Sequence, residues 1–231
     1  MHSKTTARLM TLFLTLLILL SSVTLSLASA YNFTPIDVAG AASTSASGIN
    51  NNGQIVGSYT NPDNWEHGFL LSGGVSTTIN YPGAIASGPG YWGGTILNGI
   101  NDFGVIVGGH GPTSIGVTYG FTYSGGTNFS AFPTQSGAYG SQVNGINNAG
   151  TEVGGSEWPG GIAPVYAFIN DSHGTVTINP PGSSGSSAYG INNSGWVVGD
   201  FQDSSTGVGH GFLYKNGSFT TIDDPLAVGS S

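Results

Sequence analysis

The sequence predicts an all-β repeat protein, and three observations support this class. A ten-residue stretch that begins Gly-Ile-Asn and ends Val-Gly occurs four times, at 48–57, 99–108, 145–154 and 190–199. Each copy is followed by a triplet that ends in phenylalanine, at Phe69, Phe121, Phe168 and Phe212. No part of the chain after residue 30 shows the apolar spacing of an amphipathic helix. Repetition at this period is typical of arrays of small structural units.

Each repeat has the pattern of four short strands separated by tight turns. In the first copy the expected strands are 44–50, 54–60, 66–71 and 75–81. The intervening turns contain Asn-Gly, Gly-Gly and Pro-Gly pairs, which tolerate positive φ. Four antiparallel strands in a unit of about 45 to 51 residues are typical of a β-propeller blade. We therefore expect one domain, 31–231, with repeats at about 41–83, 84–133, 134–182 and 183–225.

A β-propeller of about four blades is the architecture that these repeats favour. The segment 33–38 (FTPIDV) matches 219–224 (FTTIDD), the last strand of the fourth copy, so it reads as a further outer strand. That strand is surplus in a closed ring of four, and it either lies on an edge or belongs to a fifth blade. The alternatives are therefore an open or incomplete five-bladed propeller, or another β-repeat fold such as a solenoid or β-prism.

Residues 1–30 read as a secretory signal peptide. Lys4 and Arg8 precede an apolar run at 9–20, and Ala28-Ser29-Ala30 is typical of a cleavage site. The run is shorter than the roughly 20 residues of a membrane-spanning helix. We expect a secreted, extracellular protein whose mature chain begins near Tyr31 and has no membrane attachment.

The mature chain is strongly acidic. It keeps one basic side chain, Lys215, against eleven carboxylates, a formal net charge of −10. Nucleic acids and anionic membranes are poor partners for such a surface, because both require clustered Lys and Arg. The chain has no cysteine, so no disulfide stabilises it.

The apolar residues that recur in the copies are expected to pack between blades. They are the four phenylalanines of the triplets, an isoleucine at 49, 100, 146 and 191, and a valine at 56, 107, 153 and 198. Trp196 aligns with strand residues of the other copies and is also expected to pack.

The repeated motifs resemble those of the HAF family of extracellular bacterial repeat proteins. That family carries a Gly-Ile-Asn-Asn-x-Gly-x-x-Val-Gly stretch and a later His-Ala-Phe triplet. Here the triplets are His67-Gly-Phe, Tyr119-Gly-Phe, Tyr166-Ala-Phe and His210-Gly-Phe, so none is His-Ala-Phe. The resemblance covers nearly all of the mature chain and implies a secreted, propeller-like repeat protein, with no particular activity.

The connections between the second and third strands of each copy vary in length and carry the candidate binding residues. Variable loops on a repeated scaffold are frequent binding sites. Four aromatic residues that the repeat does not require occur in these connections or in the long one between the first two copies: Trp65, Tyr91, Trp92 and Trp158. Their flat rings suit stacking on sugars, although each ring also suits packing on its own blade.

Other side chains give weaker indications of chemistry. The histidines at 67, 110, 173 and 210 show no metal-ligand spacing, and the carboxylates at 200, 203, 223 and 224 are not placed to face one cleft. No nucleophile, zinc or phosphate-loop motif is present. We therefore expect no cofactor and no metal, and an enzyme, such as one acting on glycosides, is the least favoured class.

The predicted function is that of a secreted binding or interaction module with glycans as the leading ligand class. The alternative is a structural extracellular protein that associates with another chain through an open blade edge.

Overall fold

The structure is a computed structural model that describes residues 31–62, 64–84, 93–111, 117–135, 137–157 and 165–226. The chain divides into two units, residues 1–35 and 36–231. The described residues of the first unit, 31–35, are exposed and form no helix or strand. All sixteen strands belong to the second unit.

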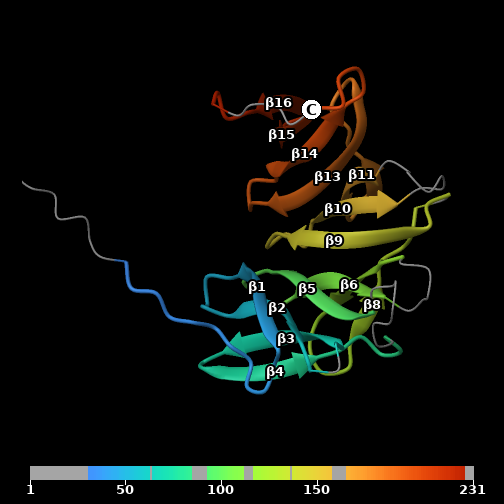
Figure 1. Ribbon diagram of the computed structural model, residues 1–231. Coiled ribbons are helices and arrows are strands. Elements are labelled where there is room, and N and C mark those ends of the chain that lie inside the picture. The colour runs from blue at the N-terminus through green and yellow to red at the C-terminus, as the bar shows by residue number, and fades with distance from the viewer. Residues whose placement is uncertain are drawn as a thin grey trace, which may run out of the picture. The chain divides into compact units, whose positions relative to one another are not determined.

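Four sheets of four antiparallel strands make up the second unit (Figure 1). The first sheet contains β1 (Ser43–Ile49), β2 (Ile55–Thr60), β3 (Glu66–Ser72) and β4 (Val75–Ile79). The second contains β5 (Gly94–Ile100), β6 (Ile106–Gly111), β7 (Tyr119–Tyr123) and β8 (Phe129–Ala131). The third contains β9 (Gly140–Ile146), β10 (Glu152–Glu157), β11 (Val165–Asp171) and β12 (Gly174–Thr177). The fourth contains β13 (Ser183–Ile191), β14 (Val197–Asp203), β15 (Gly209–Lys215) and β16 (Ser218–Ile222).

Every sheet is a simple meander in which each strand pairs with the next one along the chain. The predicted all-β repeat architecture is therefore confirmed. The strand limits in the first copy also agree with the predicted ones to within about two residues, a normal uncertainty of strand assignment. No helix long and apolar enough to span a bilayer occurs among the described residues.

In every sheet a glycine allows a strand to pack closely against the strand beside it, because there is no room for a side chain at that position. The last glycine of each Gly-Ile-Asn stretch lies beneath the strand before it and, in three of the four sheets, beneath a ring of its own sheet. At Gly154, an added Cβ would lie 1.9 Å from the carbonyl oxygen of Gln142 and 2.8 Å from the ring of Phe168. The glycine is thus required because no side chain fits there.

Three apolar clusters join consecutive sheets. Each contains the same three positions. Two belong to one sheet: a valine of the second strand, and the residue that ends or follows the fourth strand. The third is a first-strand residue of the next sheet, which packs between these two. These trios are Val56, Ile79 and Leu97; Val107, Phe132 and Val143; and Val153, Ile178 and Ala188. All nine side chains are buried. Sheet-to-sheet packing therefore depends on a repeated sequence pattern.

The prediction that all copies bury these positions is wrong at the two ends of the array. Val198 is 46% exposed and Ile49 is 68% exposed, whereas the valines of the three internal interfaces are buried, as are Ile100 and Ile146, and Ile191 is half-buried. The physical reason is that, within the described residues, no other sheet packs on these faces of the first and fourth sheets. The four sheets do not close on one another.

The strand predicted at 33–38 is not formed. In the repeats, the matching segment pairs with a third strand, as β16 pairs with β15. Residues 33–38 have no such neighbour, and Phe33 is exposed. The predicted surplus strand is therefore an irregular segment here.

Candidate functional site

The first asparagine of each Gly-Ile-Asn stretch organises the turn that follows it. Asn101 shows the pattern: its side-chain oxygen accepts hydrogen bonds from the backbone N–H of Phe103 (3.1 Å) and of Val105 (3.0 Å). Asn50, Asn147 and Asn192 make the same pair of contacts in their own turns. A side-chain amide that mimics a turn in this way is a common role of asparagine.

The same asparagines also link one sheet to the next. The Nδ2 of Asn50 donates to the carbonyl oxygen of Asn101 (3.0 Å), and Asn101 donates to Asn147 (3.1 Å). Asn147 in turn donates to the carbonyl of Asn192 (3.3 Å). A ladder of amides, which we call the asparagine ladder (Asn50, Asn101, Asn147, Asn192), therefore runs through all four sheets in one direction. This ladder was not predicted from the sequence, although every copy has an asparagine at this position.

A second row of contacts runs beside the asparagine ladder. The backbone N–H of Asn51 donates to Asp102 Oδ1 (2.9 Å), that of Asp102 to Asn148 Oδ1 (2.9 Å), and that of Asn148 to Asn193 Oδ1 (2.9 Å). The side-chain amide of Asn148 also donates to the Asp102 carboxylate (2.7 Å). These contacts from Asn148 and Asn51 lower the pKa of Asp102. The carboxylate is held ionised by amide donors and is a structural member of the row.

The four turns line one pocket of about 200 Å³. Each repeat contributes the same three positions, the isoleucine and the two residues after it. The walls therefore combine apolar side chains with amides that already bond to their neighbours. Equivalent residues of all four copies therefore meet at this place.

Trp65 is the one sequence-predicted site residue that the structure describes. It lies half-buried before β3, and its ring is 4.9 Å from that of His67. The Tyr59 ring stacks on the His67 ring, with 5.1 Å between the ring centroids. Asn61 Nδ2 donates to His67 Nε2 (3.0 Å), and the Asn80 amide contacts the other ring nitrogen. We call this group of five side chains the Trp65 cluster.

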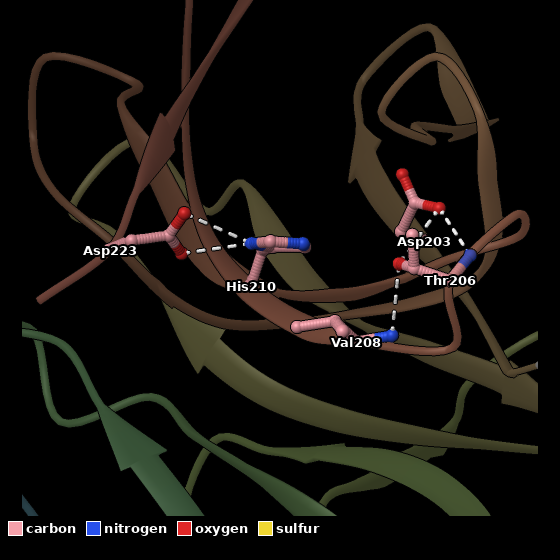
Figure 2. A network of polar contacts seen from close by, with 5 residues as sticks. All are labelled: Asp203, Thr206, Val208, His210 and Asp223. Carbon is pink, nitrogen blue, oxygen red and sulfur yellow. Dashed lines mark hydrogen bonds and ion pairs between the residues drawn. The ribbon is translucent and has the colours of Figure 1, made fainter. Parts of the chain in front are cut away.

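The fourth sheet carries a related arrangement (Figure 2). Both carboxylate oxygens of Asp223 lie 3.0 Å from His210 Nδ1, and Phe201 stacks on the His210 ring at 5.2 Å. His210 thus occupies the place of His67, with a carboxylate where Asn80 supplies an amide. No tryptophan accompanies this second histidine.

Asp203 stabilises the loop between β14 and β15 and is not free for chemistry. Its Oδ1 accepts from the backbone N–H groups of Ser205 (2.8 Å) and Thr206 (2.9 Å) and from both hydroxyls. These donors, with the Ser205 hydroxyl as the largest cause, lower the pKa of Asp203 to about 2. Asp200 is separate from it and accepts from the Tyr189 hydroxyl (3.2 Å). Within the described parts of the chain, no three His, Asp or Glu side chains converge as metal ligands.

A groove of about 620 Å³ lies along β13 and β14. Its lining includes Tyr189, Asp200, Phe201 and Gln202. In the second and third sheets, the position of Asp200 is a glycine, Gly109 or Gly155, that faces the following sheet. The part of the groove at Asp200 therefore lies on a face of the fourth sheet that no other described sheet covers, whereas Val165 of the third sheet lines another part.

The remaining predicted site residues have separate outcomes. Tyr91, Trp92 and Trp158 lie outside the described residues. Trp196, expected to pack, stands just before β14, and Lys215 Nζ lies 3.9 Å from its ring centroid. It therefore packs on its own sheet through a cation–π contact and keeps part of its surface exposed.

Comparison of the chain with family models of known proteins and with curated protein sequences finds no match. Arguments about function therefore rest on the residues themselves.

Proposed function

We propose that this is a secreted, propeller-like repeat protein of the HAF type that acts as a carbohydrate-binding module. The Trp65 cluster supports this assignment best. It combines a half-buried indole with amide and hydroxyl groups at the variable end of the first sheet. Aromatic faces bind the apolar face of a sugar ring, and amides bind its hydroxyls. In this proposal Tyr91, Trp92 and Trp158 extend the same binding end.

Tryptophan fluorescence of the purified protein tests the proposal against a panel of soluble polysaccharides and oligosaccharides. We expect a saturable change with at least one glycan. Trp65→Ala should abolish or strongly weaken it. Trp196→Ala is the matched control because Trp196 lies at the opposite end of its sheet, in the turn between β13 and β14. A response that survives loss of Trp65, Trp92 and Trp158 together would disprove the assignment.

Association with another chain through an outer strand is the second candidate. The outer strands β4, β8, β12 and β16 each pair with a single neighbour, and Val75 and Val176 on two of them are exposed. Unpaired strand edges are templates for further pairing. Light scattering tests this idea, since edge pairing predicts dimers or larger assemblies that Val75→Lys or Val176→Lys disrupts.

A further inference from the structure

The outer face of the fourth sheet has the features of an interface that lacks its partner. In the three internal interfaces, the valine of the second strand and the residue that ends or follows the fourth strand are buried under the next sheet. In the fourth sheet these two residues are Val198 and Ile222, which are 46% and 52% exposed. The glycine between them, Gly211, matches Gly68 and Gly120, on which Leu97 and Val143 of the following sheets lie. The surface is therefore already shaped for the first strand of another repeat.

The asparagine ladder ends on the same sheet with its donors unused. Nδ2 of Asn50, Asn101 and Asn147 each bonds to the next sheet, but Nδ2 of Asn192 has no partner among the described residues. The parallel row ends in the same way, because the backbone N–H of Asn193 has no acceptor there, whereas that of Asn148 does. Two donors thus point to the place where a next Gly-Ile-Asn turn would lie.

The first sheet presents the opposite surface. Ala46 holds the position of Leu97, Val143 and Ala188, yet it is exposed. Together with Ile49, Ile55 and Ile36, it lines an apolar pocket of about 300 Å³. This pocket is where a preceding sheet would insert the counterpart of Val56. The acceptors of the asparagine ladder, which begin at the Asn50 carbonyl, lie at the same end.

Residues 36–38 show which strands of that preceding sheet are missing. The backbone N–H of Val38 donates to Thr44 Oγ1 (3.1 Å), just as Tyr81, after the fourth strand of the first sheet, donates to Thr95 Oγ1 (2.9 Å). Ile36 therefore occupies the place that Ile79 has in the next interface. Ile36 and Val38 already occupy the places of residues at and after the end of a fourth strand, although no strand forms there. The first three strands of such a repeat have no counterpart among the described residues before β1.

We propose that the open face of the fourth sheet binds a three-stranded β-meander of the same repeat type, supplied by a different protein and not by a second copy of this chain, whose described sheets all have four strands. The bound meander would place an aliphatic side chain over Gly211 between Val198 and Ile222. Its Gly-Ile-Asn turn would accept from Asn192 and Asn193. Because the four turns surround one pocket, the same meander would also reach the first sheet and pack beside Ile36. This inference goes beyond the proposed sugar binding and uses different residues.

The test uses the full purified protein and a labelled synthetic peptide of residues 183–216, which carries the β13–β15 meander. Fluorescence anisotropy should show saturable binding of peptide that sedimentation shows to be monomeric. Val198→Asp should weaken binding by about tenfold or more, since it buries an unpaired charge in the interface. Val176→Asp, at an exposed valine of the outer strand β12, is the control and should leave binding unchanged. Both sites are exposed, so both variants should fold, which circular dichroism verifies.

Hydrogen exchange gives an independent readout at the proposed contact. The Asn193 amide should exchange more slowly when the peptide is bound, and a peptide with Asn193→Ala should protect it less, because the matching acceptor in the existing interfaces is the side-chain oxygen at this position. Absence of saturable binding, or binding that Val198→Asp does not change, would overturn the proposal. So would self-association of the protein alone that depends on Val198, because the occupant would then be a second copy. Trp65→Ala should not affect the peptide, so this test and the sugar test can fail separately.

Discussion

His110 is the buried titratable residue whose surroundings most strongly oppose its charge. Its ring stacks on Tyr81 with 3.7 Å between centroids, and its Nδ1 has no hydrogen-bond partner. Burial lowers the pKa of His110 to about 4, from an ordinary value of 6.5. The folded protein therefore holds a neutral imidazole at a pH where the unfolded chain binds a proton.

This shift predicts that the free energy of unfolding decreases as the pH falls from about 6.5 to about 4. As the pH falls, the unfolded state takes up the proton first, so acid favours unfolding between these two pH values. Above about pH 6.5, His110 is neutral in both states and no longer lowers the free energy of unfolding. We expect about 1–2 kcal/mol, since solvent screening reduces the full effect of the shift.

Thermal unfolding of wild type and His110→Phe between pH 4 and pH 7.5 checks this expectation. Phenylalanine keeps the stack on Tyr81 and does not titrate, so the difference between the two proteins isolates His110 from the carboxylates. Parallel pH profiles for the two proteins would contradict the assignment.

At the scale of the element, the glycine that ends each Gly-Ile-Asn stretch is held by the packing of its own strand. A methyl group at Gly154 would overlap the Gln142 carbonyl on β9. Gly154→Ala should therefore force β9 and β10 apart and cost about 3 kcal/mol or more in unfolding free energy. Gly209→Ala is the control, because Gly209 has no atom within 4 Å of an added Cβ and no positive φ. Urea denaturation of both variants measures the difference, and equal stabilities would refute the steric argument.

The asparagine ladder allows the bond between sheets to be separated from the turn that each asparagine forms. Asn101→Asp keeps the acceptor for the turn amides but loses the donor to the Asn147 carbonyl. We expect the free energy of unfolding to fall by about 1–3 kcal/mol, because a buried N–H···O hydrogen bond is replaced by two oxygens that face each other.

Asn192→Asp is the matched substitution, since Nδ2 of Asn192 makes no bond within the described residues. It should cost clearly less than Asn101→Asp in the same urea titration. Similar losses at the two positions would mean that the turn, and not the link between sheets, is what these asparagines stabilise.

The strands were predictable because each repeat contains the residue types that form tight turns. Asn52-Gly53 and Gly73-Gly74 mark the two hairpins of the first sheet, and both regions have positive φ at glycine. The buried valines and phenylalanines were predictable where a neighbouring sheet exists. Their exposure at Val198 was not, because whether a last sheet is covered depends on long-range assembly and not on local sequence.

The candidate site was less accessible from sequence. Trp65 was singled out for its ring, but its partners His67 and Tyr59 come from two strands whose register brings them together. The asparagine ladder was read as four separate turns, since a contact from Asn50 to Asn101 spans a whole repeat. Segment 33–38 has the sequence of a strand and lacks only a neighbour to pair with. In each case the missing information concerned which repeat lies next to which.

On the scale of the whole molecule, the four sheets differ in how many neighbours cover them. In the described parts of the chain, the second and third sheets have a sheet packed on each face, whereas the fourth has one on the side of the third alone. In arrays of repeats, stability is close to a sum of each unit and its interfaces. The fourth sheet therefore lacks one of the two interface contributions that stabilise the central sheets.

This difference predicts an order of local opening. Amides of β14 should exchange with solvent deuterium faster than those of β6 and β10, which occupy the same place in the central sheets, because opening an end unit breaks one interface and opening a central unit breaks two. Hydrogen exchange read by mass spectrometry compares the three strands in one experiment. If β14 is as protected as β6 and β10, its outer face is already covered in solution. Slower exchange of β14 with rising protein concentration would then identify another copy of the chain as the cover, and a concentration-independent rate would locate the cover within the same chain.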